Sequence, residues 1–353
     1  MEGAPGEVCT GSSPPTAGAR SVVTLFPEFE NVRAISIPLP GYSSLGTANI
    51  YVVGRGPITL VDTGPKFPGS FDELRSGLER LGHNLSDVER ILLTHGHLDH
   101  FGLVRSLREA AGRSIPCYIH AEDRWRVTAE IYHGEMWTEQ ADNLMAMVDM
   151  PAQEVEKIRQ GFEVLRLLCD PVLDALPMEE GDVFEGEGYY LEVIHTPGHS
   201  TGACCFYEKR RKILFSGDNI LKHITPNPLI EIQKDRLRDP NYQPLKSYLQ
   251  SLDKLARMDV RHVFPGHGAP MEDLNGIISG YREHHEERKE LVWRTLQRDS
   301  RPIYHLIDDV FPFVPEGDIF LAISEILVHL ELLIDEGRAE LADPGPPAYY
   351  RAL

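Results

Sequence analysis

Residues 94–100, which read Thr-His-Gly-His-Leu-Asp-His, restrict the fold and the chemistry of this chain more than any other segment. They place four metal-binding side chains within six residues, directly after the apolar run 91–93, where we expect a β-strand to end. Because side chains alternate along an extended chain, His95 and His97 point in the same direction. The aspartate and the histidine that follow fall on the next turn. From there they can reach a second ion about 3.5–4 Å from the first, which is the spacing of two-metal hydrolases.

Three further candidate ligands follow downstream, each after a short apolar run and beside a glycine. This is the pattern expected where a strand ends in a turn that lets the backbone approach an ion. A set of five histidines and two carboxylates suits Zn, Fe or Mn, whereas Ca and Mg prefer shells made of oxygen alone. The set contains no cysteine, which argues against a structural zinc finger. The predicted ligands are His95, His97, Asp99, His100, His199, Asp218 and His267.

Together with the segment 60–64, Leu-Val-Asp-Thr-Gly, these motifs resemble those of the metallo-β-lactamase superfamily, and within it the glyoxalase-II-like hydrolases. The resemblance covers roughly residues 30–270. It implies an α/β fold, a four-layer αβ/βα sandwich whose metals lie at one edge of the two sheets. It also implies that Asp62 supports the metal-binding loop from behind, as carboxylates commonly do for metal-bound imidazoles.

The resemblance further implies two metal ions that share one bridging carboxylate. Metal 1 would be held by His95, His97 and His199. Metal 2 would be held by Asp99, His100 and His267, and Asp218 would bridge the two ions. Position 97 holds histidine rather than the glutamate of the oxygen-reducing flavodiiron branch, and this difference favours the hydrolytic branch.

The predicted chemistry follows from the metals. A water that bridges two divalent ions loses its proton near neutral pH, so we expect a bridging hydroxide to attack a substrate carbonyl. We assign catalytic roles to Asp218, as the bridge, and to Asp99, which can hold the nucleophile. A thiolate leaves without a strong general acid, and the motifs offer no dedicated proton donor. The sequence therefore predicts a small-molecule substrate, an acyl thioester, that is hydrolysed.

Two alternative functions stay open. One is an endoribonuclease of the winged-helix branch of the superfamily. The other is a persulfide dioxygenase with a single iron at His95, His97 and His199 or a closely related subset. For the hydrolase we expect two zinc ions, with Fe or Mn as the alternatives.

Composition and charge restrict the partners and the location of the protein. The net charge of −19 argues against a nucleic-acid partner, because such a surface repels a polyanion. The one dense basic run, residues 209–212, is expected to be an exposed hairpin turn. No apolar stretch approaches the roughly 18 residues of a membrane span. Five cysteines without a framework spacing are expected to be reduced thiols of a cytoplasmic protein.

The chain divides into a tail, a catalytic domain and an appendix. Residues 1–22 are rich in Gly, Pro, Ser and Ala, lack the apolar core of a signal peptide, and are expected to form a flexible tail. The catalytic domain is expected over residues 23–270, with a helical insertion over 121–176. The apolar residues of the insertion, Trp125 and Trp137 among them, either form a lid with an acyl pocket or pack the insertion onto the sandwich.

Residues 271–353 are expected to form a small C-terminal domain. Three helical segments followed by a hairpin have the order of a winged helix, and they resemble the C-terminal domain of one branch of the superfamily. The segment carries 8 Lys and Arg against 17 Asp and Glu, a net charge of −9, and its helix over 319–336 has no basic residue. We therefore expect a packing role or a homodimer interface rather than nucleic-acid binding.

Two other histidines lie close to the predicted ligands. His195 has a suitable neighbourhood but the wrong place in its motif, so we interpret it as structural or as an outer partner of a ligand. His223 either lines the substrate cleft or stabilises its own loop. The remaining histidines match no motif and are interpreted as solvated or packed.

Overall fold

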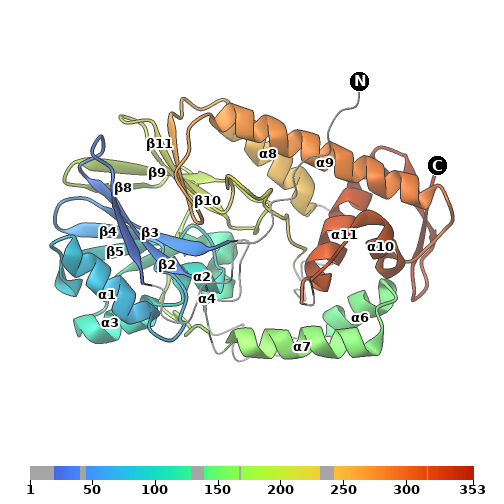
Figure 1. Cartoon of the computed structure of the whole chain (residues 1–353), viewed down its shortest axis with the longest axis horizontal. Helices are drawn as coiled ribbons and strands as arrows, with labels where there is room; N and C mark the ends of the chain where they lie inside the picture. Colours follow the sequence, from blue (N-terminus) through green and yellow to red (C-terminus); the bar gives the residue numbers. More distant parts are fainter. Residues whose placement is uncertain (1–19, 40–44, 129–138, 167, 231–241, 316) are drawn as a thin grey trace, which may run out of the picture.

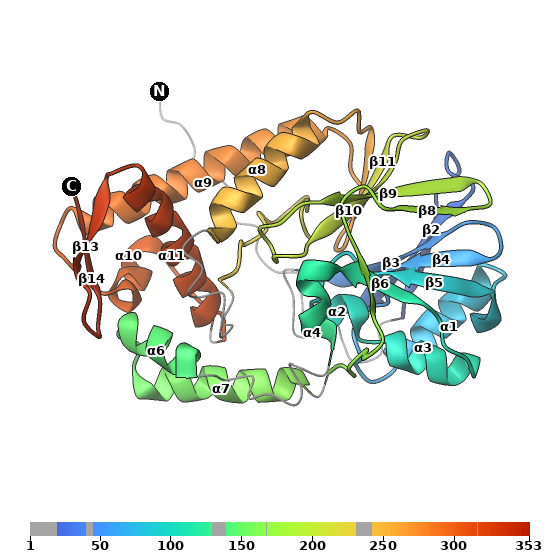
Figure 2. The ribbon, with the colours of Figure 1, turned by 180° about the vertical axis from the view of Figure 1, so that it is seen from behind.

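The computed structural model describes residues 20–39, 45–128, 139–166, 168–230, 242–315 and 317–353. Two β-sheets lie face to face, and helices cover the outer face of each sheet (Figure 1). A second group of helices lies at one end of this sandwich, where α6, α7, α10 and α11 gather (Figures 1 and 2). Within the described ranges, none of the helices combines the length and the apolar character that crossing a membrane requires.

The first sheet has seven strands, which lie side by side in their chain order. Pairing is antiparallel from β1 to β4 and parallel from β4 to β7. Strands β3 and β4 are joined by a glycine turn, in which Gly54 has a φ of 101°. The strands are β1 Val22–Leu25, β2 Val32–Pro38, β3 Thr47–Val53, β4 Ile58–Val61, β5 Val88–Leu92, β6 Cys117–His120 and β7 Leu176–Met178.

The second sheet has five strands in the order β12-β11-β10-β9-β8. Only β11 and β12 pair parallel, and the other neighbours are antiparallel. The basic run 209–212 is the turn between β10 and β11, as predicted, and it is largely exposed. The strands are β8 Val183–Gly186, β9 Tyr189–His195, β10 Cys204–Glu208, β11 Ile213–Gly217 and β12 His262–Pro265.

Three apolar cores separate four layers, which confirms the expected αβ/βα sandwich. Tyr51, Phe215 and Phe264 fill the space between the sheets, with ring centroids 5.1–5.5 Å apart. Helices α1 (Ser70–Arg80) and α3 (Val104–Ala111) pack on the first sheet, and helices α8 (Pro244–Ala256) and α9 (Leu274–Leu296) pack on the second. In α1, Leu74 and Leu78 lie one turn apart and are fully buried, so one face of the helix covers the sheet.

The insertion has four short helical segments in its described part: η2 Ala121–Asp123, α4 Arg124–Val127, α6 Glu139–Met147 and α7 Ala152–Arg166. Val127 of α4 joins the core of the first sheet. Met145 and Phe162, from α6 and α7, instead pack with the C-terminal helices, and Phe162 meets Phe320 edge to face at 5.9 Å. Helices α6 and α7 therefore pack against the C-terminal helices, whereas packing onto the sandwich was the alternative expected beside a lid. Trp137 lies outside the described residues, and the lid stays a prediction.

The C-terminal segment contains α9, η3 Ile303–Leu306, α10 Ile307–Val310, α11 Ile319–Asp335 and a hairpin of β13 Ala339–Asp343 with β14 Tyr349–Ala352. Helix α9 begins at Leu274, where the side chain of Asp273 caps it by accepting a hydrogen bond from Gly276 N. This one helix contributes to the core of the second sheet and to the core of the C-terminal helices. The winged-helix likeness and the homodimer interface stay predictions.

The acidic side chains of α11 are largely paired with basic groups of α8 and α9. Glu325 Oε1 forms an ion pair with Arg288 Nε at 2.9 Å, and Asp335 accepts from Lys246 at 2.7 Å. Glu331 differs, because its Oε2 is buried with neither a hydrogen bond nor an ion pair among the described residues. Most acidic side chains of α11 therefore help to hold the helix against its neighbours. The buried carboxylate of Glu331 instead lowers the stability of the folded protein.

Glu331→Gln should make stability less dependent on pH. Burial, followed by the nearby Asp335, raises the pKa of Glu331 from 4.5 to about 7. Between these values the folded protein binds more protons than the unfolded chain, so the free energy of unfolding falls as pH rises. We expect the variant to resist urea better than the wild-type protein at pH 8, with the difference shrinking toward pH 5.

The measurement is urea unfolding at constant metal concentration, since bound metal adds its own stabilisation. Glu283→Gln, on the exposed face of α9, is the matched control. A difference between Glu331→Gln and the wild-type protein that stays constant from pH 5 to pH 8 would contradict the pKa assignment.

Candidate metal centre

All seven predicted ligands lie together at one edge of the sandwich. They come from the ends of strands in both sheets: the loop after β5, helix α2 (Leu98–Phe101), the β9–β10 loop, and the residues directly after β11 and β12. In both views α2 and α4 lie at the end of the sandwich nearest the C-terminal helices (Figures 1 and 2). The ligand atoms fall into three overlapping groups, and within each group they lie within 4.8 Å of one another.

The first group consists of His95, His97 and His199. His97 Nδ1 lies 2.9 Å from His95 Nε2 and 3.0 Å from His199 Nε2. One ring nitrogen takes part in a single N–H···N hydrogen bond at a time, whereas a metal ion accepts a lone pair from all three rings. Burial, and next the neighbouring His199, lower the pKa of His97 to about 3. The His97 ring is therefore neutral near pH 7, and its lone pair is available.

The second group consists of Asp99, His100 and His267. His267 Nε2 lies 3.3 Å from Asp99 Oδ2 and 3.2 Å from Asp218 Oδ2. Burial acts to lower the pKa of His267, but the carboxylates of Asp218 and Asp99 outweigh it and raise this pKa to about 10. The ring holds a proton that a bound cation would displace.

Asp218 lies between the two groups. Its Oδ1 is 3.5 Å from His100 Nε2, and its Oδ2 is 3.7 Å from His199 Nε2. It also forms the third group, with His95 and His100. Burial opposes its ionisation, but His267 and His100 hold the pKa of this carboxyl well below its usual value. A charged carboxylate in this position can contact ions on both sides.

Several polar atoms of the cluster are buried without a hydrogen-bond partner among the described residues: His100 Nε2, Asp218 Oδ1 and His267 Nε2. A buried polar atom left in this state costs about 1–3 kcal/mol, and coordination of a cation would remove that cost. Imidazole nitrogens and carboxylate oxygens are donors that suit Zn, Fe and Mn. The residues present therefore fit two divalent transition-metal ions.

Asp62 contacts the back of the cluster, as the resemblance implies. Its Oδ1 accepts from Thr94 N at 2.8 Å, and its Oδ2 accepts from Thr94 Oγ1 at 2.9 Å and from His100 Nδ1 at 2.8 Å. Because Nδ1 of His100 donates to Asp62, the lone pair of this ring lies on Nε2, which faces the cluster. Asp62 thus fixes both the loop after β5 and the orientation of one ligand.

Backbone carbonyls orient two further ligand rings in the same way. His267 Nδ1 donates to Thr47 O at 2.8 Å, and His199 Nδ1 donates to Asn227 O at 3.2 Å. In each ring Nε2 is therefore the nitrogen that faces the cluster, and in His267 it carries the proton that a bound cation would displace. The acceptors belong to segments far apart in the chain, one at the start of β3 and one beyond β11.

Asp123 is a second buried carboxylate behind the cluster, and the sequence analysis missed it. Its side chain is fully buried. Oδ2 accepts from Gly96 N at 2.8 Å and from Ser200 Oγ at 2.6 Å, and Oδ1 accepts from Gly202 N at 2.7 Å. Gly96 separates His95 from His97, and Ser200 follows His199. Asp123 therefore ties together the two loops that supply the first group.

The signal for Asp123 was weak because it belongs to no motif. It lies just after β6, which pairs parallel with β5, so the ends of both strands meet at the edge that carries the ligands. An acidic residue shortly after a buried parallel strand is the pattern that could have indicated Asp123. Its partner Gly202 is sterically required, because a Cβ there would lie 2.4 Å from Asp123 N.

His195 lies outside the three groups, in agreement with its interpretation as structural. Its ring stacks on His120 with centroids 3.8 Å apart, and its Nε2 donates to Thr201 O at 2.8 Å. His223 is exposed on the loop after β11, and its contribution to a cleft stays a prediction.

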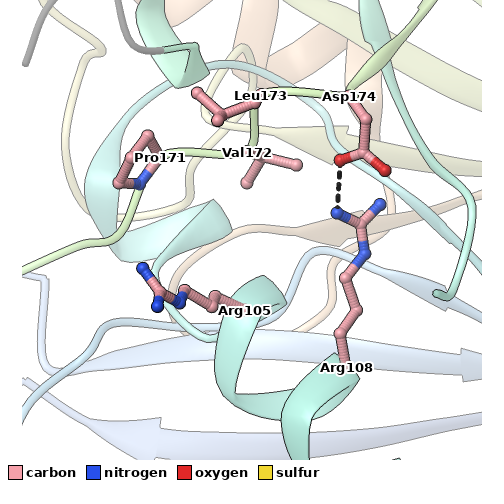
Figure 3. A pocket seen from close by; sticks show the side chains of 6 residues that line it. All are labelled: Arg105, Arg108, Pro171, Val172, Leu173 and Asp174. Atoms are coloured by element: carbon pink, nitrogen blue, oxygen red, sulfur yellow. Dashed lines mark hydrogen bonds and ion pairs between the residues drawn. The ribbon is translucent and has the colours of Figure 1, made fainter. Parts of the chain in front are cut away.

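A cleft of about 460 Å³ lies elsewhere, between α3 and residues 171–174 (Figure 3). Two arginines line it, and both are already paired. Arg108 donates to Asp174 at 2.6 Å, and Arg105 donates to Glu109 at 2.8 Å. None of the seven predicted ligands lines this cleft, so it belongs to the outer surface of α3 rather than to the metal centre.

The ligand cluster is more accessible on one side than on the other. The side chain of Asp99 is 20% exposed and that of His199 is 12% exposed, whereas His100 and His267 are 1% and 3% exposed. A substrate therefore has to approach past the half-buried His97, Asp99 and His199, with the buried ligands His95, His100, Asp218 and His267 behind them.

The comparisons with a family model, with curated proteins and with solved structures agree on one family. Residues 44–267 match the family model described as the metallo-beta-lactamase superfamily. The chain is 26% identical to the probable metallo-hydrolase YqjP of Bacillus subtilis, over 92% of this chain and 98% of that protein. It is also 26% identical to an atrochrysone carboxyl ACP thioesterase of a Cryptosporiopsis species, over 73% of this chain and 61% of the relative.

Among solved structures, the chain is similar to a metallo-beta-lactamase family protein from Thermus thermophilus. The TM-score is 0.77 and the identity 29%, over 92% of this chain and 99% of the other. The similarity therefore includes the insertion and the C-terminal helices as well as the sandwich.

Asp123→Ala should weaken metal binding although Asp123 is not a predicted ligand. The substitution leaves the N–H groups of Gly96 and Gly202 without their acceptor, so both ligand loops lose their shared support. We expect about 10–100-fold weaker binding of Zn²⁺, the usual effect of losing an outer partner. Asp123→Asn, which keeps one acceptor oxygen, should lose less.

The measurement is competition for Zn²⁺ with a chromophoric chelator, on protein shown to be folded by circular dichroism. Asp174→Ala, an exposed carboxylate in the cleft on α3, is the matched control and should bind as the wild-type protein does. Wild-type affinity in Asp123→Ala would show that the two loops hold their geometry without this carboxylate.

Proposed function

The chain belongs to the metallo-beta-lactamase superfamily, a largely hydrolytic group that binds divalent metals, and from this premise we propose that it hydrolyses acyl thioesters at a two-metal centre. The metal ligands would be those predicted from the sequence. Metal 1 is assigned to His95, His97 and His199, and metal 2 to Asp99, His100 and His267. Asp218 is assigned as the bridge.

The observation that carries this proposal is the pair of ligand groups with Asp218 between them. A single ion would need only one of these groups. Here a complete second group surrounds the other side of the same carboxylate, with Asp218 Oδ2 at 3.2 Å from His267 Nε2. This arrangement supports two ions rather than the single iron of a persulfide dioxygenase.

Bound divalent ions would lower the pKa of a water and polarise a substrate carbonyl. The protein itself supplies position and charge. Asp218, ionised and buried, holds the two ligand groups at a fixed separation. Asp99 lies on the accessible side, and its carboxylate can accept a hydrogen bond from the attacking water and so orient it.

The choice of a thioester rests on the leaving group. A thiol has a pKa near 8.5, so a thiolate can depart without a proton donor, whereas an alkoxide or an amide nitrogen needs one. None of the predicted ligands is free to act as that donor once it holds a metal. The relative that is named as an ACP thioesterase gives independent support for this substrate class.

The metal and the location are part of the same proposal. Five imidazoles with two carboxylates favour Zn²⁺, and Fe or Mn are the alternatives. Among the described residues, Cys117, Cys204 and Cys205 are free and buried. Free thiols suit a reducing compartment, so we propose the cytoplasm.

Asp218→Ala should abolish turnover and lower the metal content. We expect the wild-type protein to carry close to two transition-metal ions and to hydrolyse an acyl thioester faster than the oxygen ester of the same acid. Removing the bridge takes a ligand from both ions, so the variant should lose activity by several orders of magnitude. Asp174→Ala again serves as the control.

The measurements are metal analysis by mass spectrometry and kcat/KM on matched thioesters and oxygen esters, with RNA and a persulfide as further substrates. Full metal loading and normal turnover in Asp218→Ala would contradict the assignment of the bridge. RNA cleavage without thioester hydrolysis would favour the endoribonuclease. Oxygen consumption with one iron per chain would favour the dioxygenase.

A further inference from the structure

The segment 219–230 connects the predicted bridging ligand to the C-terminal helices and then returns to another ligand. It starts directly after Asp218 and passes along α9 and α11. At Asn227 its backbone carbonyl accepts the hydrogen bond from His199 Nδ1, at 3.2 Å. The orientation of His199 therefore depends on a carbonyl that belongs to neither sheet. Contacts with the C-terminal helices hold this carbonyl in place.

Two prolines restrict the backbone on either side of the carbonyl. Pro226 and Pro228 flank Asn227. A proline fixes its own φ and confines the preceding residue to extended conformations. The Asn227 peptide is thus stiff, and a movement of its neighbours will be transmitted to its carbonyl rather than absorbed.

Ser324 of α11 anchors the segment at residues 228 and 230, just beyond the Asn227 carbonyl. Its Oγ accepts from Ile230 N at 2.9 Å and donates to Pro228 O at 3.3 Å, and the side chain is fully buried. One hydroxyl can do both at once. A serine inside a helix usually bonds to the carbonyl four residues earlier or points to solvent. Ser324 instead uses its hydroxyl on a segment about a hundred residues away in sequence.

Other contacts fix the segment to the same helices. Asn227 Nδ2 donates to Leu321 O of α11 at 3.2 Å. Nearer Asp218, the hydroxyl of Tyr281 of α9 accepts from Leu221 N at 2.7 Å and donates to Leu221 O. The segment is therefore held at both ends by the C-terminal helices, and Ser324 makes the buried attachment closest to the carbonyl that His199 uses.

We propose that Ser324 of α11 is a positioning residue for metal 1: by fixing residues 228–230 it holds the Asn227 carbonyl that orients His199. This inference rests on the proposed metal centre, and it gives the C-terminal helices a part in metal binding. Ser324 has no contact with a metal ligand itself and acts only through Asn227.

The test is a Co²⁺ titration of the full-length, metal-free protein, in which the visible absorption of the bound ion is the readout. The wild-type protein is expected to bind two equivalents. In Ser324→Ala, one equivalent should bind about tenfold more weakly, at the lower end of the effect of an outer partner. The affected equivalent should be the one that His199→Ala loses, and its absorption bands should shift.

Two further variants separate positioning from general stability. Thr295→Val removes another buried hydroxyl of the C-terminal helices, one that bonds only to Leu291 O within α9. It should lower Tm but leave both Co²⁺ affinities unchanged. Asn227→Ala removes only the exposed bond to Leu321 O. This milder variant serves as the test if Ser324→Ala fails to fold. It should weaken binding of the same Co²⁺ equivalent to a smaller extent.

Wild-type affinity for both equivalents in Ser324→Ala and in Asn227→Ala would overturn the inference and leave the proposed function intact. Weakening of both equivalents to the same extent in Ser324→Ala and Thr295→Val would also overturn it, because the effect would then be one of stability. A wild-type protein that binds no Co²⁺ at the His199 site would overturn the proposed function and this inference together.

Discussion

The gathering of seven metal-binding side chains, four of them buried, at one edge of the sandwich is the constraint on which the rest of the structure depends. Removing carboxylates and imidazoles from water is costly unless they are paired. Here Asp218, His100 and His267 leave buried atoms without hydrogen-bond partners among the described residues. Such a cluster will spread apart unless the surrounding chain holds it. The fold therefore has to supply stiff supports on every side, and its main features around the edge can be understood as those supports.

Two buried carboxylates supply the support from behind. Asp62 fixes the loop after β5 and the ring of His100, whereas Asp123 joins that loop to the one that carries His199. Each carboxylate accepts at least one backbone N–H and also has a basic partner, since His100 Nδ1 lies 2.8 Å from Asp62 Oδ2 and Arg126 Nε lies 3.4 Å from Asp123 Oδ1. Asp123 contacts the two loops of the first group, whereas Asp62 contacts one of these loops and also His100 of the second group. The two carboxylates therefore share the support of the first group, and Asp62 alone of the two contacts the second.

The sequence was sufficient to predict the sandwich and the residues that gather at its edge, because both depend on local patterns. Residues 94–100 carry their ligands at a strand end, and the other three ligands each follow an apolar run. Asp123 and Ser324 could not be predicted in the same way. Asp123 becomes significant only because β6 pairs parallel with β5. Ser324 becomes significant only because α11 packs against the segment after Asp218. Both depend on contacts between distant segments, for which periodicity carries no signal.

The packing of the insertion shows the same dependence on distant contacts. Its apolar residues were expected either over the metals or on the sandwich, yet Met145 and Phe162 share a core with α11. Helix α9 joins that core to the core of the second sheet, because it runs continuously from one to the other. The insertion, which lies between His100 and His199 in sequence, and the C-terminal helices, which follow His267, therefore support one another. Since the segment from Asp218 to Ile230 is attached to α9 and α11, a change in this shared core has a direct route to His199. The C-terminal helices are on this argument part of the metal centre's support.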